Sequence, residues 1–248
     1  MDLIINENKE YLIPNDTDIN ILVKENINAS LIEKNDKNRN IKIEFENNSS
    51  IKYISIDLSN SSNKEIRLAK NNNLNMVLAN FNGGNKDFKI YLNDEESNLD
   101  IKSIIMMKDN DDKEKIEVYH NAKNTTSKIE NYITSNKAKI DVDVIGKIKK
   151  GMSNSNCVQK SRGIILTNDA KIKVMPVLLI DEFDVSANHG AAIGKIDEEG
   201  LYYLMSRGIS KKDAEMLIIK GFLSPILSSL SNEELKDEIL KLQDDRLW

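Results

Sequence analysis

Residues 41–58 read IKIEFENNSSIKYISIDL and contain the pattern from which the fold can be predicted. Ile41, Ile43 and Phe45 alternate with charged residues, so the hydrophobic side chains lie on one face of a strand. A second aliphatic run begins at Ile51, after a short polar segment rich in asparagine and serine. Asparagine tolerates the left-handed backbone conformation of tight turns, so this segment predicts a corner between two strands.

The same pattern recurs along residues 41–189, and no helical periodicity interrupts it. No NG or DG dipeptide is placed as a tight hairpin turn. A sandwich fits the number of strands, and so does a solenoid in which each rung buries its aliphatic face against its neighbours. Aromatic residues make up only 5% of the chain, which favours the narrow interior of a solenoid. The other expected strands are residues 51–58, 75–81, 87–92, 99–107, 114–120, 138–146, 163–168 and 172–180.

The composition, 40% hydrophobic and 30% charged, is that of a soluble globular protein. The net charge of −5 gives no electrostatic basis for binding nucleic acid. The N-terminal sequence lacks the features of a signal peptide, and no apolar run reaches the roughly 18 residues that span a bilayer. The single cysteine, Cys157, excludes an internal disulfide framework and a thiolate-rich metal site within one chain. We therefore expect a cytoplasmic protein that binds neither nucleic acid nor membrane.

After residue 190 the pattern becomes helical. Three segments begin with a capping residue, and the first two end at a glycine. The expected helices have N-caps at Asp197, Ser210 and Ser231, stops at Gly208 and Gly221, and a capping box from Ser231 to Glu234. We therefore expect a β domain at residues 1–189, of which residues 1–30 form a cap or an irregular start, and a helical domain at residues 190–248.

The junction between the two parts, residues 184–200, reads DVSANHGAAIGKIDEEG and superficially resembles a phosphate-binding loop. The resemblance fails because only three residues separate Gly190 from Gly194, and Ile196 stands where a Ser or Thr is needed. Two acidic stretches, residues 93–97 and 108–115, lack the glycine and spacing of a calcium loop. We expect both stretches to be solvated turns.

His189 and Cys157 are the residues of this chain best suited to hold a metal. Histidine is a common ligand of iron and zinc, and His189 precedes small residues at the junction. The alternative is a histidine that is merely hydrogen-bonded at the end of a strand. Cys157 has no local catalytic signature, so a surface or half-buried thiol is the alternative there.

Several spaced motifs resemble the SufB/SufD family of iron–sulfur cluster assembly proteins, over residues 114–228. They are His120 with Thr126 and Ser127, the strand GIILTNDAKI, Pro176, the acidic IDEFDV, the triplet HGA, and the helical segments YYLMSRGIS and AEMLIIKGF. The resemblance implies a right-handed parallel β-helix followed by a small helical domain. It also implies a scaffold that is not itself an enzyme.

The resemblance implies three kinds of partner. One is a second SufB/SufD-type chain, in a homodimer or a heterodimer, and another is a SufC-type ABC ATPase on the helical domain. Recipient apoproteins would accept an iron–sulfur cluster that is held transiently and shared with the partner chain. Two alternatives stay open: an ATPase-anchoring paralogue without a cluster, and a β-helix carbohydrate-active enzyme.

The junction resembles the SufD branch of the family. In the SufB branch a glutamate follows the histidine, where this chain has Gly190, and a cysteine occupies the place of Arg162. His189 is therefore the main metal candidate and Cys157 a weaker one.

The first expected helix supplies the candidates for partner binding. Leu201, Leu204 and Met205 share one face and are expected to point inward. Tyr202, Tyr203 and Arg207 surround that stripe, and tyrosine and arginine are enriched in binding hot spots. They are the candidate ATPase-binding residues, and the alternative is that the tyrosines cap the end of the β-helix.

Overall fold

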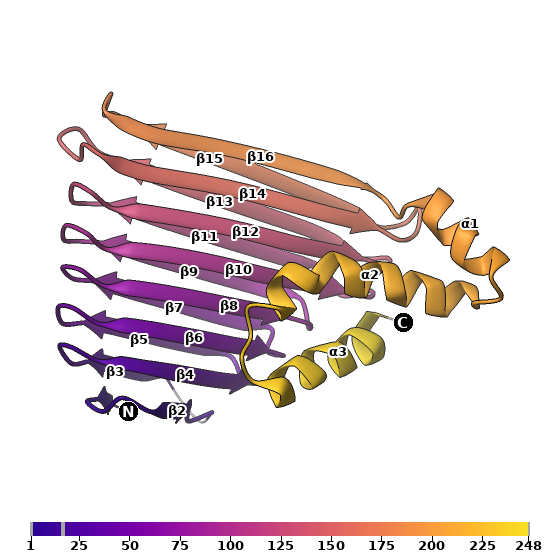
Figure 1. The fold of residues 1–248 in the computed structure, drawn as a ribbon, viewed down its shortest axis with the longest axis horizontal. Helices are drawn as coiled ribbons and strands as arrows, with labels where there is room; N and C mark the ends of the chain where they lie inside the picture. The colour runs from indigo at the N-terminus through magenta and orange to yellow at the C-terminus, as the bar shows by residue number, and fades with distance from the viewer. Residues whose placement is uncertain (1, 16–17, 248) are drawn as a thin grey trace.

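The computed structural model describes residues 2–15 and 18–247 and shows a parallel β-solenoid with three helices packed on one side (Figure 1). Within these residues, sixteen strands form two eight-stranded sheets in which all paired strands are parallel. The odd sheet contains β1 (Asp2–Ile5), β3 (Ile19–Val23), β5 (Arg39–Phe45), β7 (Ser61–Leu68), β9 (Gly84–Leu92), β11 (Asp112–His120), β13 (Lys139–Ile148) and β15 (Lys171–Ile180). The even sheet contains β2 (Glu10–Ile13), β4 (Asn28–Asn35), β6 (Ser50–Asp57), β8 (Asn73–Asn80), β10 (Asn98–Met107), β12 (Thr126–Ser135), β14 (Ser155–Ile165) and β16 (Val185–Lys195).

Each rung consists of one strand from each sheet, and the rungs widen along the chain (Figure 1). The strands lengthen from 4 residues in β1 to 11 in β16. Because sequential strands alternate between the sheets and pair in parallel, a sandwich of hairpins is excluded for these residues. The expected parallel β-helix with C-terminal helices is confirmed.

Asparagine makes one set of corners, between each odd strand and the following even strand. Six non-glycine residues there have a positive φ, and five of them are asparagine: Asn26, Asn48, Asn71, Asn124 and Asn154, with Glu96 as the sixth. Neighbouring corners are also joined by side chains, since Asn71 donates to the Asn48 side-chain oxygen at 3.1 Å. The asparagine richness of the chain is thus a property of its corners.

The opposite corners require a glycine at one position. Gly84 has a φ of 97°, and a Cβ placed there would lie 2.0 Å from the Asn60 carbonyl oxygen. A side chain at this position would therefore clash with the backbone of the rung below.

The solenoid interior is built from columns of aliphatic side chains. Ile43, Ile66, Ile90 and Val118 occupy equivalent positions in successive rungs, and each is fully buried. Burying one such side chain contributes about 1.5–3 kcal/mol to stability. β-Branched residues suit these positions because they pack well against their neighbours on a pleated surface.

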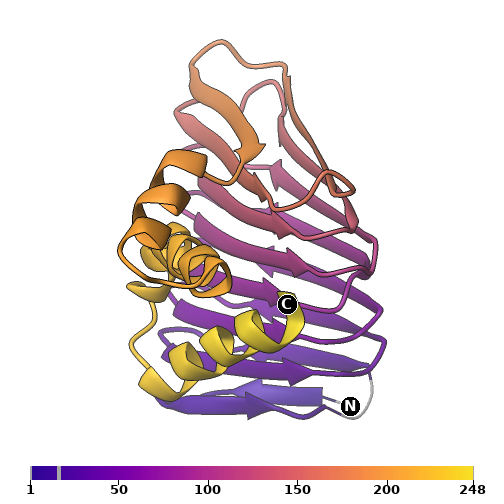
Figure 2. The ribbon, with the colours of Figure 1, turned by 90° about the vertical axis from the view of Figure 1, so that its right-hand side faces the viewer.

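The C-terminal helices are α1 (Glu198–Ser206), α2 (Lys211–Leu227) and α3 (Glu233–Leu247). Helices α2 and α3 lie across the outer face of the even sheet (Figures 1 and 2). Ile219, Leu223 and Ile239 pack there against residues of the even strands, and the Phe222 ring meets Tyr132 edge-on at 5.2 Å. None of the described helices combines the length and apolar composition needed to cross a membrane.

Two of the expected helix boundaries are wrong. Helix α2 continues through Gly221 and Pro225 to Leu227, because Leu223, Ile226 and Leu227 bury their side chains against the even sheet. This burial outweighs the cost of a helical glycine, about 1 kcal/mol. The N-cap of α3 is Asn232 rather than Ser231, since its side-chain oxygen accepts from the Leu235 amide at 3.2 Å.

Strand prediction missed β7 and β12 between the expected strands and found only the end of β14. Their interior positions carry Ser62, Lys64, Ser127, Cys157 and Gln159, so the apolar alternation is broken there. Strand β16 continues to Lys195, and part of residues 1–30 forms four strands, with residues 1, 16 and 17 outside the described residues. The division into domains after residue 189 stays a prediction.

Candidate functional site

The last rung, β15 and β16, has neighbours on one side only and forms what we call the open end of the solenoid. Side chains that would be covered in the middle of the stack are only half-buried along β15. Four hydrophobic residues at this end are exposed: Met175, Leu179, Phe183 and Ile193. Pro176 interrupts the hydrogen-bonding edge of β15, as proline does on edge strands, whereas β16 carries small residues and no proline.

His189 lies in the middle of β16, not after a strand as the sequence indicated. It is paired in register with Gln159 of β14, which is paired with Ile129 of β12. Since Ile129 and Gln159 are buried interior residues, His189 stands in an interior column whose next rung is absent from the described residues. Its side chain is exposed, so an imidazole nitrogen is accessible at the open end.

Cys157 lies on β14, one rung below His189. It is two residues from Gln159 on the same strand, so both side chains face the interior. The thiol is fully buried, contrary to the expectation of a surface or half-buried cysteine. Burial raises its pKa, and the Ser127 hydroxyl opposes that shift in part. A raised thiol pKa means that Cys157 is protonated and weakly nucleophilic at neutral pH.

Gly146 makes room for this thiol. A Cβ at residue 146 would lie 2.5 Å from Cys157 Sγ and 3.1 Å from Gln159 Nε2. Gln159 donates to the Val177 carbonyl oxygen at 3.3 Å, while its own Oε1 has no partner among the described residues. The interior beneath His189 is therefore polar and tightly packed.

His120, the other histidine of the chain, is buried at the end of β11. Its ring nitrogens contact Thr125 Oγ1 at 2.7 Å and Ser127 Oγ at 2.9 Å. In the neighbouring rungs the same column holds Leu92 and Ile148. Burial lowers the His120 pKa to about 4, so the ring is neutral at physiological pH. His120 holds the interior together through hydrogen bonds and is not exposed to a ligand.

Metal-binding side chains do not gather within this chain: the described residues contain no group of three or more His, Cys, Asp or Glu placed to hold a metal ion. Cys157 and His189 lie on neighbouring strands of the even sheet. They differ in solvent exposure, because the Cys157 thiol is buried and the His189 imidazole is exposed.

Helix α1 projects from the end of β16, beyond the part of the even sheet that α2 covers (Figure 1). Tyr202 and Tyr203 are 76% and 57% exposed, and the Arg207 guanidinium lies 5.3 Å from the Tyr203 ring centre. Leu201 and Leu204 are half-buried, whereas Met205, which was expected to point inward, is exposed. The tyrosines do not cap the end of the solenoid, since most of their surface is accessible.

The acidic stretch at residues 108–115 is only partly a solvated turn. Its second half belongs to β11, where Asp112 and Glu114 point into the interior and are buried. That expectation is therefore wrong for these two residues, because a strand, not a turn, sets their direction. Residues 93–97 do form the turn between β9 and β10.

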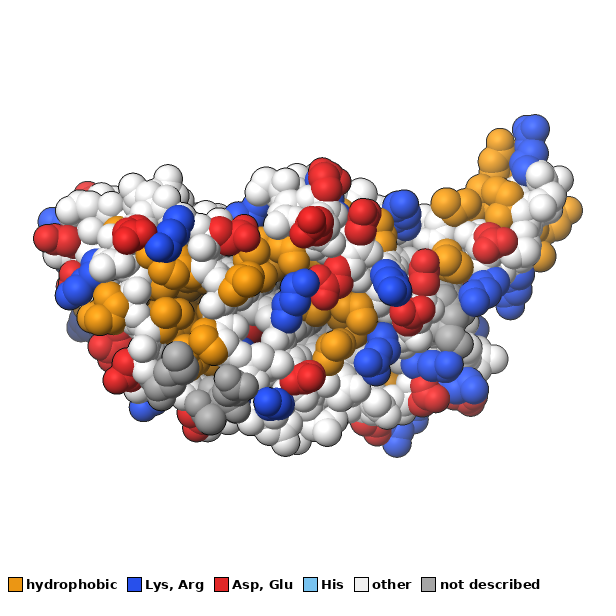
Figure 3. Space-filling view, turned by 90° about the horizontal axis from the view of Figure 1, so that it is seen from below, with side chains coloured by type: hydrophobic (Ala, Val, Ile, Leu, Met, Phe, Trp, Pro, Cys, Tyr) orange, Lys and Arg blue, Asp and Glu red, His pale blue; other side chains and the backbone are white. Residues whose placement is uncertain are grey.

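The opposite end of the solenoid, at β1 and β2, also exposes hydrophobic side chains among charged ones (Figure 3). Ile4 and Leu12 are 52% and 71% exposed there. On the outer face of the odd sheet, Tyr91 and Tyr119 stack at 4.7 Å, with Arg67 over one ring and Lys147 over the other. This pair presents no open ring face to a sugar.

The fold and the site define a β-solenoid protein that presents an imidazole and apolar side chains at an open end. The family model described as SUF system FeS cluster assembly, SufBD core domain, matches residues 6–222. The chain therefore belongs to the SufBD family of the SUF system, as its motifs indicated.

Three relatives resemble the chain over part of its length. It is 47% identical over 98 residues to the iron–sulfur cluster assembly protein SufD of Bacillus subtilis, a match that covers 40% of this chain and 22% of that protein. The SufD protein of Escherichia coli is 35% identical over 96 residues, with 39% and 21% covered. An iron–sulfur cluster assembly SufBD family protein of Pyrococcus horikoshii is 40% identical over 92 residues, with 36% and 19% covered. The matched segments span only about a fifth of each relative.

Sequence reasoning missed Gln159, which lies directly below His189. The signal was present, since Cys157, Gln159 and Ser161 are spaced two residues apart and so share one face of a strand. It went unnoticed because polar interior residues do not produce the hydrophobic alternation by which strands are recognised.

Proposed function

We propose that this chain is a SufD-like scaffold subunit on which iron–sulfur clusters are assembled, and that its open end pairs with a second SufB/SufD-type chain. The observation that carries the proposal is the position of His189. It stands on the interior face of the last rung, exposed beside an unpaired strand edge and four exposed hydrophobic residues. A second chain placed there would cover the apolar side chains and bring its own donors to the imidazole.

The cluster is the cargo of this scaffold, shared transiently between the two chains. Neutral imidazole is a good ligand for iron, so His189 supplies one ligand from this side. Further ligands come from the partner in this proposal, because the described residues contain no group of three or more His, Cys, Asp or Glu placed to hold a metal ion. Cys157 is the weaker candidate, since its buried thiol must first become accessible and lose its proton.

The helical unit is proposed to bind a SufC-type ABC ATPase through Tyr202, Tyr203 and Arg207. Large exposed aromatic residues with a stacked arginine are the composition of binding hot spots. In this proposal the ATPase hydrolyses the nucleotide, the chain itself catalyses no reaction, and recipient apoproteins accept the cluster. The complex would act in the cytoplasm.

A second candidate function is an ATPase-anchoring paralogue that pairs and docks but holds no cluster. It is favoured by Gly190 and Arg162, which stand where the SufB branch has a glutamate and a cysteine. The two functions differ in one measurable property, the iron content of the assembled complex.

Co-expression with a SufC-type ATPase and a SufB-type chain tests the proposal. The complex is purified without oxygen, and its iron and acid-labile sulfide are measured before and after reconstitution. The proposed scaffold acquires both elements and loses most of them in His189→Ala, while the subunits stay together. A complex that forms but never takes up iron supports the anchoring function instead.

A further inference from the structure

The solenoid contains seven buried ionisable side chains, carried by strands from β4 to β11, that form one interior ionic cluster. Four are carboxylic acids and three are bases, and each is at most 5% exposed. They are Glu33, Asp57, Asp112 and Glu114, with Arg39, Lys64 and Lys86. If all were ionised, the interior would hold one uncompensated negative charge, which is costly in a medium of low polarity.

Glu33 is fully compensated at one end of this cluster. Arg39 Nη2 lies 2.5 Å and Lys64 Nζ 3.1 Å from its carboxylate oxygens. The Ser55 hydroxyl donates to it at 2.7 Å, and the Tyr53 hydroxyl donates as well. Burial alone would raise the Glu33 pKa, but Lys64, Arg39 and the Tyr53 hydroxyl lower it to about 2. Glu33 is therefore ionised.

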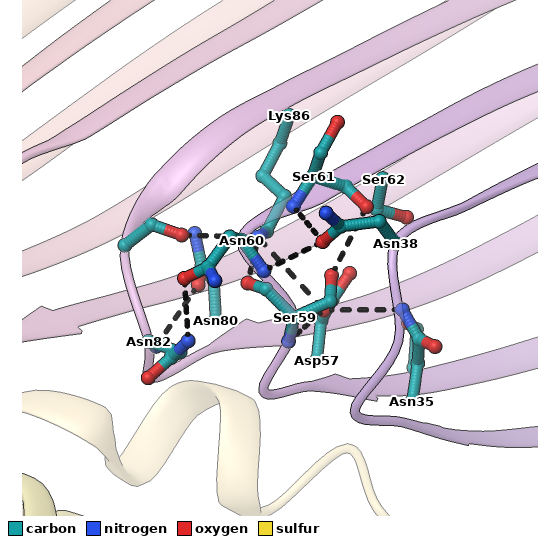
Figure 4. Close-up of polar contacts among 12 residues, drawn as sticks. Asn35, Asn38, Asp57, Ser59, Asn60, Ser61, Ser62, Asn80, Asn82 and Lys86 are labelled. Carbon is teal, nitrogen blue, oxygen red and sulfur yellow. Dashed lines mark hydrogen bonds and ion pairs between the residues drawn. The ribbon is translucent and has the colours of Figure 1, made fainter.

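Asp57 and Lys86 lie close together among polar side chains of neighbouring rungs (Figure 4). Lys86 Nζ lies 3.9 Å from Asp57 Oδ1 and donates to the carbonyl oxygens of Ser59 and Gly83, at 2.5 and 3.1 Å. Asp57 Oδ1 also accepts from the Ser59 amide and hydroxyl, at 2.8 and 2.6 Å. Because the Lys86 ammonium is held beside Asp57 and two backbone oxygens, its charge offsets that of Glu114 only in part.

Asp112 and Glu114 lie two residues apart on the interior face of β11, and both are buried. The Asn80 side chain donates to Asp112 Oδ1 at 3.0 Å, and the Ser103 hydroxyl lies 3.4 Å from Glu114 Oε1. Glu114 pairs in register with Lys86 on β9 and with the aliphatic Val142 on β13. Asp112 Oδ2 is buried and has no hydrogen-bond donor among the described residues. The two acids therefore face each other's charge with only Lys86 to offset it.

We propose that the Asp112–Glu114 pair holds one proton inside the solenoid at neutral pH, and that release of this proton at mildly alkaline pH destabilises the solenoid. The proton removes the one uncompensated negative charge among the seven groups. It resides mainly on Glu114, because burial and the neighbouring Asp112 raise the Glu114 pKa to about 8, and burial raises that of Asp112 to about 6.

The direction of the pH effect follows from the raised pKa of Glu114. In the unfolded chain this group loses its proton near its usual pKa of 4.5, whereas the folded chain keeps it up to about pH 8. The folded state therefore binds one proton more than the unfolded state across this range, and the stability is lost as pH rises. The neutral His120 ring adds a smaller dependence of opposite sign near pH 6.5, where the unfolded histidine is half-protonated, and this contribution fades above about pH 7.5.

Urea unfolding of the full chain at several pH values between 6.5 and 8 tests the proposal. The unfolding equilibrium constant of the wild type is expected to rise by about tenfold per pH unit, the consequence of one linked proton. Glu114→Gln, whose amide resembles the protonated acid, should abolish this dependence. A wild-type stability that does not change with pH, or an unchanged slope in Glu114→Gln, would overturn the proposal.

Glu117→Gln is the matched control, because Glu117 lies on the same strand but faces outward. Burial tends to raise its pKa, but Lys115 and Lys147 lower it to about 2, so it is ionised throughout the range. This variant should lose stability equally at every pH and keep the wild-type slope. If Glu114→Gln fails to fold, infrared spectroscopy of the wild type tests the proposal instead. The carbonyl band of a protonated carboxylic acid should be present at pH 7 and lost at pH 9. Absence of this band at pH 7 refutes the proposal.

Discussion

The N-terminal rungs and the last rung both place polar side chains on the interior face of the solenoid, with opposite results. In the N-terminal rungs, Glu33 is fully buried and is paired with Arg39 and Lys64. In the last rung, His189 also lies on the interior face of the even sheet but is exposed. The comparison teaches that an interior residue of a solenoid has a structural role where rungs stack on both sides of it. Where the stack ends, the same face is exposed, and we propose that it binds a partner chain.

Removing the buried acid of the N-terminal rungs is expected to have the largest effect. Glu33→Ala removes the buried carboxylate that both Arg39 and Lys64 contact, which should lower the free energy of unfolding by about 3–5 kcal/mol. Urea denaturation followed by circular dichroism measures this loss. Glu65→Ala is the control, because its ion pair with Arg67 is solvent-accessible and contributes about 0–1 kcal/mol. Equal losses in the two variants would contradict the structural role of the cluster.

The two histidines allow a buried and an exposed interior-face residue of the same type to be compared. His120→Ala leaves Thr125 and Ser127 without their buried partner and should cost about 2–3 kcal/mol of stability. His189→Ala should change stability by no more than about 0.5 kcal/mol, since the side chain is exposed. Differential scanning calorimetry of both variants at pH 7 would show the contrast.

The cost of His120→Ala should also depend on pH. Because burial lowers the His120 pKa to about 4, the stability that this group contributes is present above pH 6.5 and is lost as the pH falls through 4. The difference between wild type and His120→Ala should therefore shrink between pH 7 and pH 4. A constant difference would mean that the imidazole is not buried in its neutral form.

Pairing at the open end should respond to a charge placed in it. Ile193→Asp puts a carboxylate on the exposed interior face of β16 and should weaken pairing in the co-expressed complex by about 2 kcal/mol, roughly a 30-fold change in Kd. Analytical ultracentrifugation gives the change. Leu12→Asp, at the opposite end of the solenoid, is the matched control and should leave pairing intact.

Docking of the ATPase is expected to show a smaller effect. Arg207→Glu reverses a charge beside Tyr203 and should weaken ATPase binding by about 1–2 kcal/mol, measured by isothermal titration calorimetry. Lys241→Glu, an equal charge change on the exposed side of α3, should have no effect. Point substitutions are preferred to deleting the helices, because α2 and α3 cover the apolar outer face of the even sheet. Equal weakening by both variants would place the docking surface elsewhere.

The parts of the fold that could be predicted from the sequence are those with apolar interiors. Strand β5 alternates clearly, and asparagine-rich segments mark the corners, so the solenoid followed by helices could be anticipated. The polar interior could not, because Cys157, Gln159 and Glu114 resemble solvent-facing residues until the stacking of rungs is known. The capped starts of helices were easier to predict than the end of α2, which tertiary packing carries past Gly221.

The site was partly predictable, through resemblance more than through pattern. His189 was singled out by its neighbours, but its place above Gln159 depends on a register of parallel strands that spans 30 residues of chain. The burial of Cys157 likewise depends on β16 lying over it, which no local pattern encodes.

The most direct test of the account is the iron and sulfide content of the anaerobically assembled complex, compared between wild type, His189→Ala and Leu12→Asp. The account predicts that the subunits of all three complexes stay associated and that only His189→Ala loses most of its iron and sulfide. Undiminished iron and sulfide in His189→Ala, in a complex of unchanged stability, would contradict the claim that the open end of the solenoid is the site of cluster assembly.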